Sequence, residues 1–99
     1  MNEERKNNIY QIKEEILKIL SNSDFPMRSK EIYYHFNEAK PEYYKCAITD
    51  LERTNMKTFS EIREEYELSR RPFCFNKNTR LFYSNEKQIE NWIRANNLS

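Results

Sequence analysis

Four long cations, Arg70, Arg71, Lys77 and Arg80, lie in the stretch 69–85, which contains no acidic residue and has aromatic side chains interleaved with them. Long cations reach phosphate oxygens, and exposed rings stack on unpaired bases, so this segment has the chemistry of a nucleic-acid contact. Two other interpretations stay open. The cations can simply keep a strand edge soluble while the rings attach it to the core, or the segment can bind an acidic protein.

Residues suited to catalysis or metal binding are few. His35 is the only histidine, and although Glu31 and Glu38 are near it in sequence, no nucleophile shares a recognisable motif with it. Together with Cys46 and Cys74 it offers three scattered ligands, whereas a structural zinc site needs four. We therefore expect no catalytic residue, no metal and no cofactor, and we interpret the chain as a non-enzyme.

Glycine is absent from all 99 residues. Phosphate-cradling loops, dinucleotide-binding turns and nucleophile elbows need glycine, because the backbone there turns sharply or approaches a ligand closely, so these classes of site are excluded. Asparagine is abundant instead, and after glycine it best tolerates the left-handed conformation. The net charge is +1, and an aromatic content of 14% supplies large side chains for a core.

The chain length suits one domain, 1–99, with one modest hydrophobic core. Apolar runs such as 81–83 are only a few residues long, and the first residues are charged, so we expect neither a membrane segment nor an export signal. Two cysteines in such a chain indicate reduced thiols and a cytoplasmic location.

Apolar residues recur at three- and four-residue spacing over 8–21, which predicts an amphipathic first helix. A second helix is predicted over 29–37, with Ser29 as its expected N-cap. Pro41 is the expected first residue of a third helix, over 41–54, because its missing N–H costs nothing at that position.

A short extended link at 25–27 is predicted between the first two helices, since a residue before proline avoids the helical conformation. Thr58 and Glu61 have the spacing of a capping box, and apolar residues continue at helical period, which predicts a fourth helix over 59–68. A strand beginning near Tyr66 is the open alternative.

The apolar period changes from helical to alternating after the fourth helix. Alternation at 73–75 and 81–83, on either side of the basic, polar turn 76–79, predicts a β-hairpin over 72–84. A last amphipathic helix is predicted over 85–96. The expected fold class is therefore mostly α with a small β-hairpin.

Three segments carry a resemblance to a known family: an apolar helix end at 16–20, a Ser-capped helix start at 27–32, and an apolar, charged and basic run at 47–53. With its order of helix, extended link, helix, tight turn, helix and hairpin, the chain resembles the winged helix-turn-helix family over roughly residues 9–84. The resemblance implies a winged helix domain followed by a C-terminal helix. The connection from the third helix to the hairpin is longer than is usual in that family.

In winged helix proteins the third helix usually enters the major groove, and the wing touches the neighbouring backbone or minor groove. The site residues that the resemblance implies are Tyr43, Lys45 and Thr49 on the third helix, and Arg28, Ser29 and Lys30 on phosphate at the start of the second. The implied function is that of a small transcriptional regulator that binds duplex DNA. A homodimer would form through the first helix or the Trp92-bearing last helix.

The weak net charge of the third helix leaves two alternatives to the duplex-DNA hypothesis open. Glu42, Asp50 and Glu52 offset Lys45 and Arg53, so the third helix is not a strongly basic surface. One rival is a protein-interaction module on the same framework, with Tyr10, Tyr33, Tyr34 and Tyr43 as its interface. The other is a single-strand binder that uses the aromatic hairpin.

Overall fold

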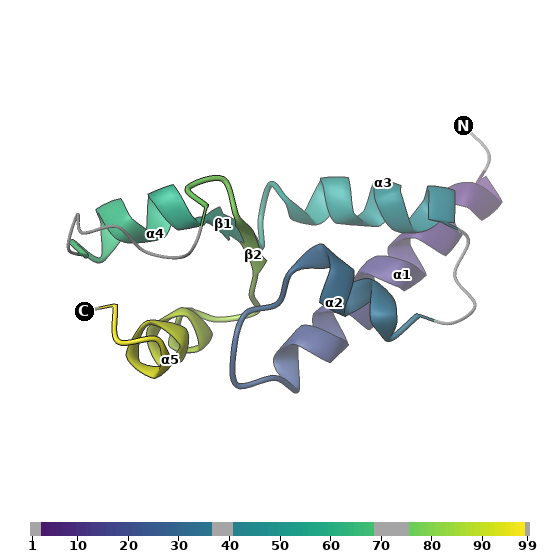
Figure 1. The fold of residues 1–99 in the computed structure, drawn as a ribbon. Coiled ribbons are helices and arrows are strands. Elements are labelled where there is room, and N and C mark those ends of the chain that lie inside the picture. Colours follow the sequence, from purple (N-terminus) through teal and green to yellow (C-terminus); the bar gives the residue numbers. More distant parts are fainter. Residues whose placement is uncertain (1–2, 37–40, 69–75, 99) are drawn as a thin grey trace.

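The computed structural model of this chain describes residues 3–36, 41–68 and 76–98 (Figure 1). These residues form α1 (Glu3–Ser21), α2 (Ser29–Tyr34), α3 (Pro41–Leu51), β1 (Met56–Thr58), α4 (Phe59–Glu65), β2 (Arg80–Phe82) and α5 (Glu86–Ala95). The chain is mostly helical with one small antiparallel pair of strands, which confirms the predicted class.

The predicted helices are all present, but their ends differ. α1 begins at Glu3 instead of at 8, because two glutamates in its first turn favour the positive end of the helix dipole. α2, α3 and α4 end at Tyr34, Leu51 and Glu65 instead of at 37, 54 and 68. α5 is one residue shorter at each end than predicted, because Asn85 and Asn96 are its caps.

Ser29 is the first residue of α2, so its prediction as the N-cap is wrong. Arg28 occupies the N-cap position in an extended conformation, and no side chain caps the helix from there. The carboxylate of Glu31 instead reaches back and accepts from the backbone N–H of Arg28 at 3.4 Å. This is the carboxylate half of a capping box, which satisfies one N–H at the start of α2.

β2 is the central strand of a small sheet. It pairs with β1 antiparallel, with Lys57 opposite Leu81. On its other edge the N–H of Met27 donates to the carbonyl of Phe82 at 2.8 Å, and the N–H of Phe82 donates to the carbonyl of Met27 at 2.7 Å. The extended link predicted between the first two helices is thereby confirmed, and β2 joins it to β1.

The strand described over 80–82 pairs with a segment that was not predicted from the sequence as its partner. The hairpin predicted over 72–84 uses 73–75 as its first strand, and that segment lies outside the described residues. β2 pairs instead with β1, and α4 lies in the connection between the two strands. Alternation identifies a strand but not its partner, and the three residues of β1 are too few to show a period of their own. The long connection between the third helix and 81–83 therefore contains β1 and α4.

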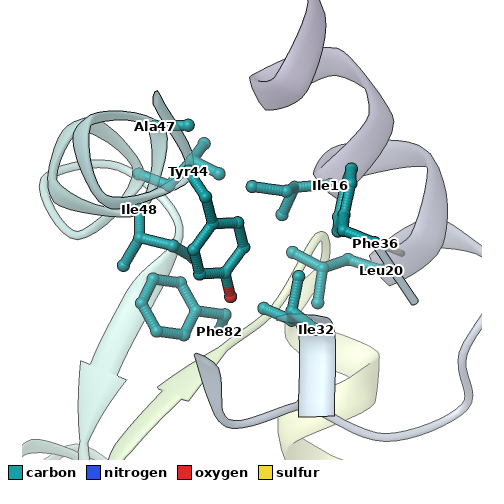
Figure 2. Packing of buried hydrophobic residues seen from close by; sticks show 9 residues of the cluster. Ile16, Leu20, Ile32, Phe36, Tyr44, Ala47, Ile48 and Phe82 are labelled. Atoms are coloured by element: carbon teal, nitrogen blue, oxygen red, sulfur yellow. The ribbon is translucent and has the colours of Figure 1, made fainter. Parts of the chain in front are cut away.

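Two hydrophobic clusters share this sheet, where the chain length suggests one core. Consecutive β2 residues point to opposite faces, so Leu81 and Phe82 enter different clusters. The cluster of α1, α2 and α3 (Figure 2) contains Ile16, Leu20, Ile32, Phe36, Tyr44, Ala47, Ile48, Leu51 and Phe82. The cluster of α4 and α5 contains Phe59, Ile62, Leu68, Leu81, Ile89, Trp92, Ile93 and Leu98. The molecule is accordingly elongated, with extents of 48 × 23 × 19 Å, and its two helical parts lie on either side of the strands (Figure 1).

Trp92 is buried in the second cluster, where its ring lies 5.9 Å from that of Phe59 in an edge-on arrangement. The apolar face of α5 is thus used inside the molecule. A homodimer through the first helix or the Trp92-bearing last helix stays a prediction, since a helical apolar stripe indicates burial but not against which partner.

Gln88 anchors α5 to the end of α1. Its side chain is the only buried polar one among the described residues. Its Nε2 donates to the carbonyls of Leu20 at 2.5 Å and Ser23 at 2.8 Å. Its Oε1 accepts from the N–H of Ser84 at 2.7 Å and from that of Asn85 at 3.4 Å. The two clusters are therefore joined by a hydrogen-bonded amide as well as by the sheet.

α4 and α5 begin in the same way. The hydroxyl of Thr58 accepts from the N–H of Glu61, and the side-chain carbonyl of Asn85 accepts from that of Gln88, both at 3.2 Å. In each case the side chain of the third helical residue accepts in return from the backbone N–H of the cap residue, which completes a capping box. The capping box predicted at Thr58 is confirmed, and the segment that follows it is helix as far as Glu65. Tyr66 and Glu67 form a turn, and beyond Leu68 the strand considered from Tyr66 lies outside the described residues.

Both helices also end in the same way, in a Schellman motif. At the end of α4, Glu67 has a φ of 51°, and the N–H of Leu68 donates to the carbonyl of Arg63 at 2.9 Å. At the end of α5, Asn97 with a φ of 53° and Leu98 repeat this arrangement. Asparagine tolerates the left-handed region, whereas glutamate is strained there.

Candidate nucleic-acid interface

A groove of about 560 Å³ runs between α2 and α3 and collects four of the predicted site residues. Its lining consists of Ser29, Lys30 and Tyr33 from α2 and Tyr44, Lys45, Ile48 and Thr49 from α3. The two lysines come from different helices, and both are exposed. The groove thus has a cation on each wall and an apolar floor.

Tyr44 holds the two walls together. Its ring points into the first cluster near Ile32 and Ile48 (Figure 2), and its hydroxyl donates to the backbone carbonyl of Ser29 at 2.5 Å. Burial raises the pKa of Tyr44 to about 12, so the hydroxyl keeps its proton and remains a donor throughout the physiological range. The first turn of α2 is thereby fixed against the middle of α3.

The hydroxyl group of Thr49 is not available as a hydrogen-bond donor to a ligand in the groove. Its hydroxyl donates to the carbonyl of Lys45 one turn earlier, at 2.9 Å. The hydroxyl proton is therefore committed to the helix backbone, and the groove receives the methyl group and the oxygen lone pairs.

Two of the three acidic residues counted against α3 pair with cations on other elements, whereas Glu42 is exposed. Asp50 lies 3.8 Å from the Nζ of Lys13 on α1, and Glu52 lies 2.8 Å from a guanidinium nitrogen of Arg80 on β2. Among the described residues that line the groove, none carries a carboxylate. The local charge is therefore more positive than the sequence of α3 indicates.

The other residues predicted on α2 and α3 lie outside the groove. Arg28 lines a second groove of about 480 Å³ on the far side of α2, together with Lys30 and Tyr34. Tyr43 is half-buried and lines neither groove. Lys30 is thus the residue that borders both.

The predicted basic hairpin is only partly described. Arg70 and Arg71 lie outside the described residues. Arg80 is exposed but is paired with Glu52, as described above. Lys77 is exposed, and its carbonyl accepts from the N–H of Ser60 at 3.0 Å, so the turn 76–79 folds back onto the start of α4. The described part of this segment is therefore not a free basic tip.

A second polar cluster joins β1, α4 and α5. The Nζ of Lys57 lies 2.5 Å from Glu65 and 2.9 Å from Glu86, and 5.5 Å from the centre of the Tyr83 ring. The hydroxyl of Tyr66 donates to the other oxygen of Glu86. Sequence reasoning missed this cluster, because its members are spread over four segments and only folding brings them together.

The electrostatics of the Lys57 cluster favour its charged form. Burial lowers the pKa of Lys57, but the hydrogen bonds to Glu65 and Glu86 outweigh it, and the pKa is raised overall. Hydrogen bonds from Tyr66 and Lys57 lower the pKa of Glu86. Burial, reinforced by Glu86, raises the pKa of Tyr66 to about 12. A lysine held protonated in this way is a structural cation and not a nucleophile.

Cys46 is a half-buried thiol whose Sγ lies 4.0 Å from a guanidinium nitrogen of Arg5, and His35 is exposed at the C-cap of α2. Within the described residues, no three potential ligands come together as a metal site would need. No helix in that part of the chain has the length and apolar character needed to cross a bilayer.

Comparisons with protein-family models, with curated proteins and with solved structures gave no match. Function must therefore be argued from the geometry of this chain. The α2–α3 groove brings together four of the ten sequence-predicted site residues.

Proposed function

We propose that this chain is a winged helix-turn-helix domain that binds duplex DNA through α2 and α3. The observation that carries the proposal is the groove between these helices, where Lys30 and Lys45 stand on opposite walls and the described lining has no carboxylate. Phosphate contacts supply most of the affinity of DNA-binding proteins, and they require unopposed cations of this kind.

The order of elements supports the winged helix assignment. α1 is followed by the extended link at Met27, by α2 and α3, and then by an antiparallel pair of strands. The same order carries the resemblance in the sequence. In this chain α4 and the turn 76–79 lie in the connection where a wing would stand.

The geometry favours an arrangement in which α3 contacts base edges and α2 contacts phosphates. Lys45 and Thr49 lie one turn apart on the exposed side of α3. Because the hydroxyl proton of Thr49 is committed to the helix backbone, its methyl group is the part best suited to DNA, and thymine methyl groups are its natural partner. We expect Tyr43 to contribute from the edge of this surface.

The first test is fluorescence-anisotropy binding to random duplex DNA at increasing salt, with a Lys30→Ala/Lys45→Ala double variant. Each phosphate contact contributes a slope of about 0.9 to the dependence of log affinity on log salt, so the double variant should lower the slope by roughly 2. A Lys18→Ala/Lys87→Ala variant removes the same charge from exposed positions on α1 and α5 and should leave the slope within a few tenths of the wild type. Absence of duplex binding by the wild type at low salt would refute the proposal.

A protein-interaction module is the second candidate, and one observation favours it. Tyr34 is 85% exposed and Tyr10 is 62% exposed, on α2 and α1 respectively. Exposed tyrosines are typical of protein interfaces. A partner bound through these rings would show weak salt dependence and would be lost in a Tyr34→Ala variant but not in the Lys30→Ala/Lys45→Ala variant.

A further inference from the structure

The α2–α3 groove has more apolar surface than a phosphate contact requires. Its floor is formed by Tyr44 and Ile48, and the ring of Tyr33 stands beside them. A phosphodiester backbone needs only cations and N–H donors. A volume of about 560 Å³ lies in the range of sites that take up an organic group.

Tyr33 is held ready for a stacking contact. Its ring lies 4.9 Å from that of Tyr44 with an angle of 69° between the planes, so the buried ring supports the exposed one edge-on. The residue remains 42% exposed. A ring fixed in this way offers a free face without the entropic cost of ordering a mobile side chain.

Charge decides which flat apolar group fits. Lys30 and Lys45 flank the Tyr33 ring from different helices, and neither is in an ion pair with a described residue. The complementary occupant combines a planar ring with an anion. A nucleotide has this combination, and in a paired duplex its base is stacked and out of reach.

We propose that the α2–α3 groove takes up one unpaired nucleotide, with its base on Tyr33 and its phosphates on Lys30 and Lys45. This inference rests on the proposed function and specifies its substrate as a duplex that carries a single-stranded extension. The duplex occupies the exposed side of α3, and the first unpaired nucleotide enters the groove beside it.

The test compares three labelled probes by anisotropy: a blunt duplex, the same duplex with a short thymidine overhang, and the same duplex with an overhang that has phosphates but no bases. A base stacked on an aromatic side chain is expected to contribute about tenfold in affinity. The wild type should therefore bind the thymidine overhang about tenfold more tightly than the blunt duplex. The overhang without bases keeps its phosphates for Lys30 and Lys45 but has no base to stack on Tyr33, so it should bind more weakly than the thymidine overhang.

Tyr33→Leu should abolish the preference for the thymidine overhang while leaving blunt-duplex affinity within about twofold, because the phosphate contacts remain. Tyr34→Leu is the matched control, since it removes the neighbouring and more exposed ring, which borders the other groove, and should keep the preference. Equal affinity of the wild type for blunt and overhang probes, or a preference that survives Tyr33→Leu, would overturn the inference while leaving duplex binding intact. Binding of none of the probes would overturn the proposed function itself and this inference with it.

Discussion

Replacing Gln88 with methionine should destabilise the protein by about 2–3 kcal/mol. The substitution keeps the length of the side chain but removes the two bonds to the carbonyls of Leu20 and Ser23 and the acceptor for the N–H of Ser84. Each lost hydrogen bond lowers the free energy of unfolding by about 1 kcal/mol net. Position 88 is 2% exposed, so burial of the apolar methionine side chain offsets part of this loss.

The assay is thermal and urea unfolding followed by circular dichroism and by the fluorescence of Trp92, which is buried in the second cluster. For a chain of this size the loss corresponds to a decrease in Tm of roughly 10–20 °C. Gln11→Met, at an exposed position on α1, is the matched control and should change stability by less than about 0.5 kcal/mol.

Gln88→Glu separates hydrogen bonding from packing. A carboxylate at this position faces the carbonyls of Leu20 and Ser23, so burial and repulsion should raise its pKa above the unfolded value. The folded state then binds the proton more tightly, and the variant should gain stability as the pH falls below 7, until the unfolded value is passed. A methionine variant as stable as the wild type, or a glutamate variant without this gain relative to wild type, would refute the anchor role of Gln88.

Two further predictions concern the end of α4 and the polar cluster around Lys57. Glu67→Gly should stabilise the protein by about 0.5–1 kcal/mol in urea unfolding, because glycine removes the cost of a positive φ, whereas Glu64→Gly within α4 should destabilise it. The pKa of Glu86 is lowered in the folded state. The contribution of Glu86 to stability is therefore fully present above its pKa in the unfolded chain, near 4.3, and is lost as the pH falls through its pKa in the folded protein. Unfolding titrated from pH 7 to pH 2.5 should show a smaller acid loss for Glu86→Gln than for the wild type, and equal losses would contradict this assignment.

Local signals in the sequence were sufficient for the helices. The apolar period of α1, the proline at the start of α3 and the Thr58 capping box depend on neighbours within one or two turns, and such signals can be read along the chain. Strand pairing is not local. The pairing of β1 with β2 depends on contacts between residues more than twenty positions apart. The three residues of β1 are too few to show an alternating apolar pattern from which the strand could be predicted.

In the candidate site, too, residue types and local positions could be predicted from the sequence, whereas contacts between distant segments could not. Four residues were predicted from their types and from the positions that the family resemblance implies, and the structure collects them in one groove: Ser29, Lys30, Lys45 and Thr49. The state of Arg80 was not predictable, because its pairing with Glu52 depends on the fold. The groove floor was missed for a similar reason. An apolar stripe predicts that Tyr44 and Ile48 are buried, but not that part of their surface borders a cationic groove.

The central position of β2 has a consequence for how the chain reaches its folded state. Phe82 completes the cluster of α1, α2 and α3, yet it is made only after α4 and its flanking turns. During synthesis the first three helices can form their local turns, but their shared apolar surface stays open until residue 82 has left the ribosome. Because this contact closes a long loop, it should slow folding. A chaperone that shields apolar surface would have its longest opportunity to act in that interval.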